Sequence, residues 1–386
     1  MGVPLMPKKR IRILAALCLL SLLLTGCQGM FEKEYRFEEA YEEEYTATRR
    51  DSSVQEVRSY SGMVNALMNL IGFAAESGII RTTKYNGAVE DDISRACFEV
   101  TRETPLGLYA VEYMSHSVSR ILSYYEISVN ISYKHTAEEI AAIRTVHTSR
   151  ELQEQITETL AAQEDSLTFM QVSTEFGEEE IRSMTEQAYR DDPLSIPEQP
   201  EISVNIYSSP STVQRITELQ LDYALPAAEL ARRPAALRLW CDTYFKERWG
   251  FDALILAREV CSLLRPFGTA RTAYDALIGG ASADDEAYAM VMKLVCEYCG
   301  IDCYVVSGRR DQRERFWNIV EWEGDYYHLD ASEAAVTGTE PALLSDRQML
   351  SLYRWDTSRY PACEAELPAP AEEWEPAEGV IKPSAE

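Results

Sequence analysis

A six-residue segment occurs twice in this chain and predicts a β-sheet in its fold. Glu-Ile-Ser-Val-Asn-Ile spans residues 126–131 and recurs letter for letter at residues 201–206. In both copies, apolar Ile and Val alternate with polar Ser and Asn, and this period of two is typical of a strand with one buried face. The sequences that follow the two copies differ. We therefore interpret the copies as two strands of one sheet and not as the mark of an internal duplication.

Helical patterns around these strands indicate an α+β fold class. Between residues 54 and 75, apolar residues recur at helical spacing, namely Val64, Leu67, Met68, Leu70, Ile71 and Ala74. Thr136-Ala-Glu-Glu139 is a capping-box pattern that predicts the start of a helix of about 30 residues. The second hexapeptide and the segment up to Tyr223 are predicted to form a hairpin. We expect residues 53–225 to form an α+β domain of unknown function, since the sequence shows no catalytic constellation there.

The first 26 residues predict a lipoprotein signal peptide that is removed before folding. A basic stretch at residues 8–12 precedes a 12-residue apolar run at residues 13–24, which is too short to cross a bilayer comfortably as a helix. The next residues, Leu24-Thr25-Gly26-Cys27, resemble the bacterial lipobox, in which cleavage exposes a cysteine that carries lipid. Two or three acyl chains on Cys27 would give stable anchoring to the cell membrane at its extracytoplasmic face. The alternative is an ordinary secretory peptide with a cysteine nearby.

The charge balance argues against nucleic acid as a partner. The chain has 63 Asp and Glu residues against 37 Lys and Arg residues, a formal net charge of −26, so polyanions and anionic lipid headgroups are repelled. Glutamates crowd into residues 27–52, which we expect to form a solvated acidic tether. Proline and acidic residues fill residues 367–386, which we expect to be a disordered tail.

An ordered series of motifs lies between residues 273 and 363. In chain order they are Ala273-Tyr-Asp-Ala-Leu-Ile-Gly-Gly280, Ala287-Tyr-Ala289, Gly300-Ile-Asp-Cys-Tyr-Val-Val-Ser-Gly308, Trp317-Asn-Ile-Val320, Tyr326-Tyr-His-Leu-Asp330, Leu344-Ser-Asp346 and Trp355-Asp-Thr-Ser-Arg-Tyr-Pro361. Together they resemble the bacterial transglutaminase-like family of the papain-like superfamily. The resemblance implies a helix-plus-antiparallel-sheet domain over residues 226–366, preceded by the separate α+β domain. It also implies a catalytic cysteine at a helix N-terminus, a histidine base and an aspartate.

This chain departs from the family pattern at the two decisive positions. The resemblance places the nucleophile at Asp285, the histidine at Arg315 and the third triad member at Asp330. Only the aspartate matches, and arginine cannot accept a proton at any useful pH. We therefore expect a degenerate triad without catalytic activity. If the fold is retained, the Asp285 carboxylate and the Arg315 guanidinium should lie within about 4 Å, or one water-bridged step, in a cleft shared with Asp330.

Other residues in this stretch do not suggest a replacement site. Cys296 lies on the same predicted helix as Asp285, but about 16 Å further along it. The Cys296-x-x-Cys299 pattern with Cys303 could indicate a redox or metal site. No fourth metal ligand is evident, however, and we expect these cysteines to be buried thiols, as free cysteines usually are. His328 shares a strand face with Asp330, and we expect it to be structural. We predict no metal and no cofactor.

These inferences lead to one functional expectation and two alternatives. We expect an exported, membrane-anchored lipoprotein with a catalytically inactive transglutaminase-like domain and a binding or scaffolding role at the cell envelope. Its partners would be the membrane, through Cys27, and a protein, peptide or glycan of the envelope. The first alternative is an active cysteine hydrolase or acyltransferase with an unrecognised catalytic set. The second is a sensor module that binds a peptide or glycan in the cleft that contains the degenerate triad.

The lipobox resemblance predicts the chemistry of the mature N-terminus. Mass spectrometry of the membrane fraction should identify Cys27 as the first residue, carrying acyl chains. A mature N-terminus at another position, or an unmodified Cys27, would contradict this prediction.

Overall fold

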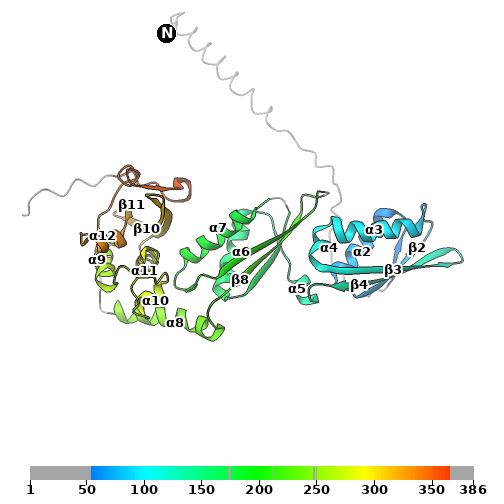
Figure 1. The fold of residues 1–386 in the computed structure, drawn as a ribbon, viewed down its shortest axis with the longest axis horizontal. Coiled ribbons are helices and arrows are strands. Elements are labelled where there is room, and N and C mark those ends of the chain that lie inside the picture. Colours follow the sequence, from blue (N-terminus) through cyan, green and yellow to red (C-terminus); the bar gives the residue numbers. More distant parts are fainter. Residues whose placement is uncertain (1–53, 173–174, 211, 247, 249, 366–386) are drawn as a thin grey trace, which may run out of the picture. The chain divides into compact units, whose positions relative to one another are not determined.

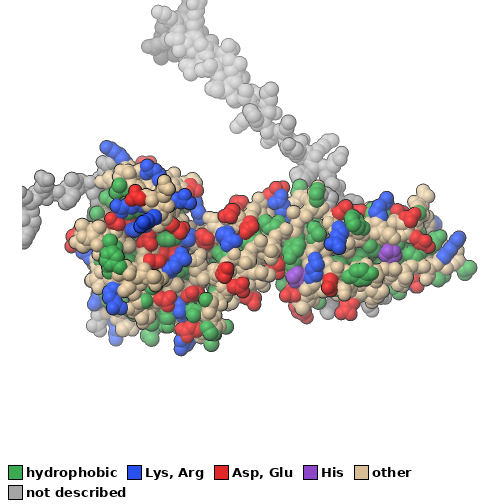
Figure 2. Space-filling view, viewed as in Figure 1, with side chains coloured by type: hydrophobic (Ala, Val, Ile, Leu, Met, Phe, Trp, Pro, Cys, Tyr) green, Lys and Arg blue, Asp and Glu red, His purple; other side chains and the backbone are tan. Residues whose placement is uncertain are grey.

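The computed structural model describes residues 54–172, 175–210, 212–246, 248 and 250–365 (Figure 1). The predicted signal peptide, acidic tether and C-terminal tail, and with them Cys27, lie outside these residues. The described chain is α+β and contains three four-stranded sheets. Its acidic and basic side chains are interspersed over the face seen in Figure 2. No helix in the described part of the chain has the length and apolar character needed to cross a membrane.

The first sheet belongs to residues 54–133, which we call the first module. Its elements are β1 (Val54–Val57), α2 (Tyr60–Gly72), β2 (Ser77–Thr82), α3 (Val89–Glu103), α4 (Pro105–Ala110), β3 (Val111–Ile121) and β4 (Tyr124–Tyr133). The strand order is β1-β2-β4-β3, with β1 parallel to β2 and the other pairs antiparallel. Helices α2 and α3 pack against each other, and α3 also packs on β3.

The second sheet belongs to residues 144–222, the second module. The short helix α5 (Ala137–Ala141) precedes it, and its elements are β5 (Arg144–Val146), α6 (Ser149–Ala162), β6 (Ser166–Gln171), α7 (Glu178–Asp191), β7 (Glu201–Ser208) and β8 (Arg215–Asp222). The strand order is β5-β6-β8-β7, again with the first pair parallel and the others antiparallel. The two modules therefore share one topology.

The prediction that the two hexapeptides are strands of one sheet is wrong. The first copy lies in β4, an inner strand of the first sheet, and the second lies in β7, an edge strand of the second sheet. By topology β4 corresponds to β8, and β7 corresponds to β3. The two identical hexapeptides thus lie in strands at non-equivalent positions of their sheets. Alternation of apolar and polar residues predicts a strand with one buried face, but it does not determine the position of that strand in a sheet.

The helix of about 30 residues predicted from Thr136 is also wrong, although its start is right. Thr136 and Glu139 form the capping box, but α5 ends at Ala141. Residues 144–146 then pair with β6 as β5, and Thr148 caps a new helix, α6, by accepting the N–H of Glu151. Strand pairing overrides the helical pattern at that point. The predicted hairpin is confirmed as the antiparallel pair β7–β8.

The third sheet belongs to the C-terminal region, residues 226–365. Its elements are α8 (Ala227–Tyr244), α9 (Ala253–Leu263), α10 (Ala273–Leu277), α11 (Asp285–Tyr298), β9 (Cys303–Arg310), β10 (Arg313–Trp322), β11 (Asp325–Leu329), α12 (Ala331–Thr337), α13 (Asp346–Met349), β12 (Tyr353–Trp355) and the 3-10 turn η2 (Thr357–Arg359). The sheet is antiparallel with the order β11-β10-β9-β12. The predicted helix and strands around the motifs are present.

Helix α11 is the centre of this region. Every residue from Glu286 to Cys296 is buried, because the helix packs on β9 and β10 and also against α9, α10 and α12. Helix α11 thus lacks the polar face of an ordinary surface helix. The buried Glu286 carboxylate is held between two guanidinium groups, Arg271 at 2.5 Å and Arg190 of α7 at 3.4 Å. The second module and the C-terminal region are joined through this ion pair.

The buried ion pair leads to a prediction about the free energy of unfolding. Replacing Glu286 with Ala leaves the 6 % exposed Arg190 side chain without its strongest buried partner. Removing one member of a buried pair is strongly destabilising, so we expect the free energy of unfolding to fall by about 3 kcal/mol. Urea denaturation measures it. The exposed Arg150–Glu154 pair is the control, and Glu154→Ala should change little. Equal effects of both variants would contradict a structural role for the buried pair.

Candidate functional site

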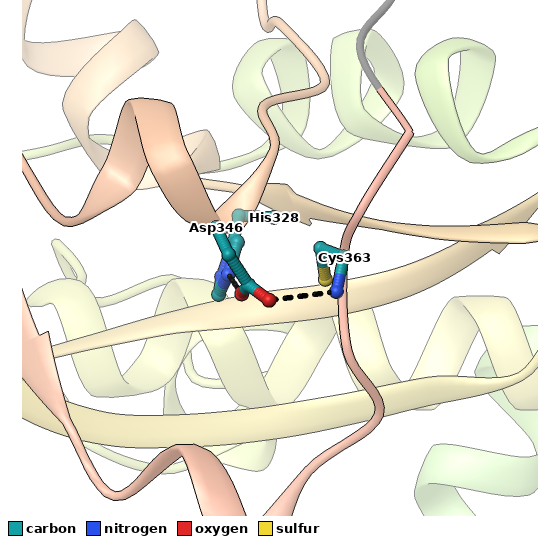
Figure 3. Close-up of side chains that lie close together, drawn as sticks. All are labelled: His328, Asp346 and Cys363. Atoms are coloured by element: carbon teal, nitrogen blue, oxygen red, sulfur yellow. Dashed lines mark hydrogen bonds and ion pairs between the residues drawn. The ribbon is translucent and has the colours of Figure 1, made fainter.

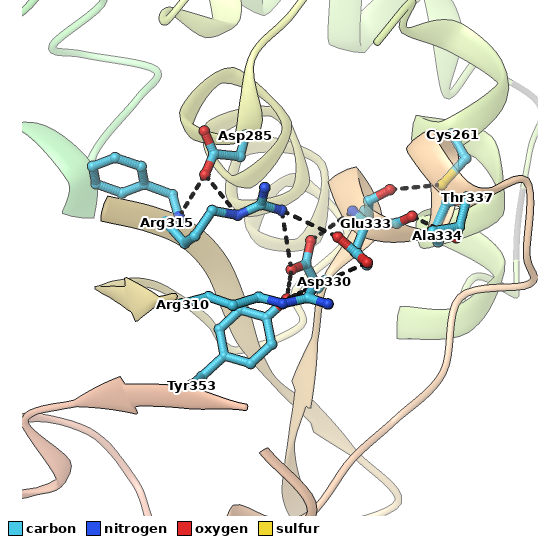
Figure 4. A network of polar contacts seen from close by, with 11 residues as sticks. Cys261, Asp285, Arg310, Arg315, Asp330, Glu333, Ala334, Thr337 and Tyr353 are labelled. Atoms are coloured by element: carbon cyan, nitrogen blue, oxygen red, sulfur yellow. Dashed lines mark hydrogen bonds and ion pairs between the residues drawn. The ribbon is translucent and has the colours of Figure 1, made fainter. Parts of the chain in front are cut away.

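Asp285 lies at the start of α11, where the resemblance expects a nucleophile. The helix begins there because the Asp284 side chain accepts the Ala287 N–H at 2.9 Å. The Asp285 carboxylate turns towards β10, accepts the Phe316 N–H at 3.0 Å and lies 3.2 Å from Arg315 Nε (Figure 4). The expected contact between Asp285 and Arg315 is therefore present.

Arg315 reaches from β10 across the end of the sheet to a second acidic group. Its Nη2 lies 3.7 Å from Asp330 Oδ2 and 3.5 Å from Glu333 Oε2. The Arg315 side chain is 25 % exposed and Asp330 is 8 % exposed, so the cluster is largely withdrawn from water. The structure thus brings Asp285, Arg315 and Asp330 together around one guanidinium group.

Asp330 is fixed by its own backbone position. It caps α12 by accepting the Glu333 N–H at 2.8 Å, and the Tyr353 hydroxyl donates to its Oδ2 at 2.8 Å. Burial raises the pKa of the Asp330 carboxyl, while these two hydrogen bonds and Arg315 act in the opposite direction. The aspartate is thus oriented by three groups, none of which is an imidazole.

The sequence reasoning missed three members of this network. Arg310 at the end of β9 pairs with Glu333 at 2.9 Å and contacts the Tyr353 hydroxyl at 3.1 Å (Figure 4). The Asp330-x-x-Glu333 spacing at a strand end is a capping signal that could have found Glu333. Arg310 and Tyr353 carry no local signal, because the pairing of β9 with β12 brings them together.

A small cavity of about 220 Å³ lies beside this network. Arg310, Asp330, Glu333 and Tyr353 form its polar wall, and its apolar wall includes Leu344 and other residues of the chain segment before β12. The network therefore offers both signs of charge to a small group that enters the cavity. It offers no unpaired nucleophile.

Burial raises the pKa of the thiols that lie near this site and at the end of α11. Cys261 lies near the network, where its Sγ donates to the Ala331 carbonyl at 3.3 Å, and burial raises its pKa to about 11. Burial also raises the pKa of Cys296 and Cys299, so the CxxC pattern at the end of α11 carries no activated thiol. A thiolate nucleophile would need the opposite shift.

The His328 side chain lies beside Asp346 and Cys363 (Figure 3), and its two ring nitrogens contact Trp317 and Asp346. Trp317 Nε1 lies 2.9 Å from His328 Nδ1, and Asp346 Oδ1 lies 2.8 Å from its Nε2. Because the indole can only donate, Nδ1 accepts and Nε2–H donates to the carboxylate. Burial lowers the pKa of this fully buried imidazole, so it is neutral. Both ring nitrogens of the buried His328 are therefore engaged in hydrogen bonds.

Cys363 completes a group with His328 and Asp346 whose potential ligand atoms lie within 4.8 Å of one another (Figure 3). A metal ion needs an imidazole lone pair, and here Nδ1 uses its lone pair for Trp317 while Nε2 carries the proton. Asp346 Oδ2 also accepts the Cys363 N–H at 3.0 Å. These residues fit a hydrogen-bonded anchor for the C-terminal segment and do not fit a metal site.

Comparisons with known proteins found weak similarity to solved structures. No protein-family model and no curated protein matches the chain. One matching solved structure, described as a "Putative Cysteine Protease from Cytophaga hutchinsonii", is 9% identical and covers 40% of this chain and 70% of its own, with a TM-score of 0.23. A second, described as a TGase, is 8% identical and covers 53% of this chain and 60% of its own, with a TM-score of 0.24. Such scores do not establish a shared fold, so the fold class shown for this chain is α+β.

Proposed function

We propose that this chain is an exported, membrane-anchored lipoprotein whose C-terminal region is a transglutaminase-like domain without catalytic activity. Its role would be binding or scaffolding at the extracytoplasmic face of the cell membrane. The observation that carries the proposal is the Asp285–Arg315–Asp330 cluster. These residues stand where the family resemblance expects cysteine, histidine and aspartate, and they contact one another as a triad would.

The chemistry of the cluster supports inactivity. Acyl transfer through a thioester needs a thiolate at the helix N-terminus and a base that takes up and returns a proton. The cluster has a carboxylate in place of the thiol and a permanent cation in place of the base. The Arg315 guanidinium lies within 4 Å of three carboxylates, which neutralise it. The exchange keeps the polar groups paired and removes their reactivity.

A binding role is supported by the cavity beside the network. Arg310 and Glu333 present opposite charges at its wall, next to apolar side chains. This mixture suits a small polar group such as a peptide terminus or a sugar hydroxyl. The sensor alternative, a peptide- or glycan-binding module, rests on this cavity. The alternative of an active enzyme has no comparable support among the described residues of the C-terminal region.

The proposal predicts no cysteine-dependent amidase or transamidase activity for the wild-type chain. Asp285→Cys alone should give a thiol at a helix N-terminus beside Arg315, which iodoacetamide alkylates faster than any wild-type thiol. Without a base it should show little amide turnover. Asp285→Cys combined with Arg315→His supplies both missing groups and should raise turnover above that of either single variant. Alkylation rates and amide turnover are measured across the series.

Asp285→Ala is the matched control, because it removes the carboxylate without adding a nucleophile. Circular dichroism confirms that each variant is folded, since Asp285 also accepts the Phe316 N–H. Robust wild-type turnover that survives Asp285→Ala would defeat the proposed inactivity and would point to a separate active site.

A further inference from the structure

A cysteine and a histidine meet on the first module, far in sequence from the cluster of the C-terminal region. Cys97 lies on α3 and His116 lies on β3, and Cys97 Sγ is 3.7 Å from His116 Nδ1. Among the described strands, β3 pairs only with β4, so it forms one edge of its sheet. The pair therefore stands where α3 packs on the edge strand of this sheet.

The hydrogen bonds around His116 fix which nitrogen carries the proton. Ser94 lies one helical turn before Cys97, and its hydroxyl donates to the Glu90 carbonyl at 2.8 Å. The same oxygen lies 3.2 Å from His116 Nε2, so it accepts the Nε2–H. The lone pair of Nδ1 is then directed towards the sulfur. This arrangement matches metal-bound histidines, whose second ring nitrogen donates to a nearby acceptor.

Met114 is a further soft side chain that lines the same cavity as this pair. Met114 lies two residues before His116, on the same face of β3. Cys97, Met114 and His116 all line one cavity of about 340 Å³. Among the described residues, no third His, Cys, Asp or Glu stands with this pair in a group at ligand distance. The available donors are therefore one thiol, one thioether and one imidazole nitrogen.

We propose that Cys97, Met114 and His116 bind a soft monovalent metal ion, and that Cu(I) is the ion they suit. Thiolate and thioether ligands favour Cu(I), whereas Ca²⁺ and Mg²⁺ require oxygen ligands, and a structural Zn²⁺ site requires four donors. On binding, the Cys97 S–H loses its proton to solvent as the sulfur–copper bond forms, and Nδ1 donates its lone pair. The copper remains Cu(I) throughout, so no oxidant or reductant is needed.

Burial raises the pKa of the Cys97 thiol to about 11. Cys97 is therefore protonated when the site is empty, and the metal must displace its proton. The site is separate from the Asp285–Arg315–Asp330 cluster, so it does not depend on the function proposed there.

The test is an anaerobic titration of the full chain with Cu(I), in competition with a coloured Cu(I) chelator. Wild type should withdraw one tight equivalent that Cys97→Ser and His116→Gln lose, with affinity reduced at least about tenfold. Met114→Leu should weaken the same equivalent. Cys363→Ser is the matched control, because it removes another buried thiol beside a histidine whose two nitrogens are already engaged, and it should keep this equivalent.

Two outcomes would overturn the proposal. The first is the same tight stoichiometry and affinity in wild type, Cys97→Ser and His116→Gln. The second is equal retention of Zn²⁺ and Cu(I) by the wild-type chain, which would exclude a soft monovalent site. Nitrogen-15 NMR of the wild-type histidines decides the matter if a variant fails to fold. The His116 Nδ1 signal should move on addition of one equivalent of Cu(I), and an unchanged signal would likewise refute the site.

Discussion

The start of a buried helix is the constraint on which the C-terminal region depends. Helix α11 is enclosed on all sides, so the polar groups of its first turn cannot rely on water. Three successive acidic residues meet this requirement with three different sets of partners. Asp284 caps the helix, Asp285 accepts a backbone N–H from β10, and Glu286 receives two arginines. The helix, the sheet and the second module are aligned by these contacts. Their negative charge also favours the positive end of the helix dipole.

The same contacts account for the character of the candidate site. A carboxylate at the helix start orders β10 through Phe316 and holds Arg315 against Asp330. Tyr353 and Arg310 extend this order to β12 and β9. The cluster is a hydrogen-bonded junction that joins the helices α11 and α12 to the strands β9, β10 and β12. The order of the junction has a single cause, which is that each of its polar groups has an oppositely charged or hydrogen-bonding neighbour.

Sequence patterns predicted the parts of this protein that depend on local order along the chain. The family resemblance placed Asp285, Arg315 and Asp330 together, because it assigns all three to one site. Arg310 and Tyr353 could not be placed there, since strand pairing alone brings them to Asp330. The second sheet was missed for a related reason: six identical residues describe the face of a strand and carry no information about its neighbours. The contact between Cys97 and His116 could not be predicted from the sequence. The two residues lie on a helix and a strand that are separated in the chain by α4, and only the tertiary fold brings them together.

The shared topology of the two modules has a mechanical consequence. In each sheet the first strand of the module lies at an edge, and β1 is joined to β2 by only four residue pairs. A pulling force that enters at the N-terminal end of the described chain acts on β1 before any other strand. Peeling β1 away breaks one short row of hydrogen bonds and leaves the antiparallel strands β2, β4 and β3 paired. In the first module, β1 can therefore detach and extend the chain while the other three strands stay paired. In the second module, β5 has the same edge position and the same short parallel pairing.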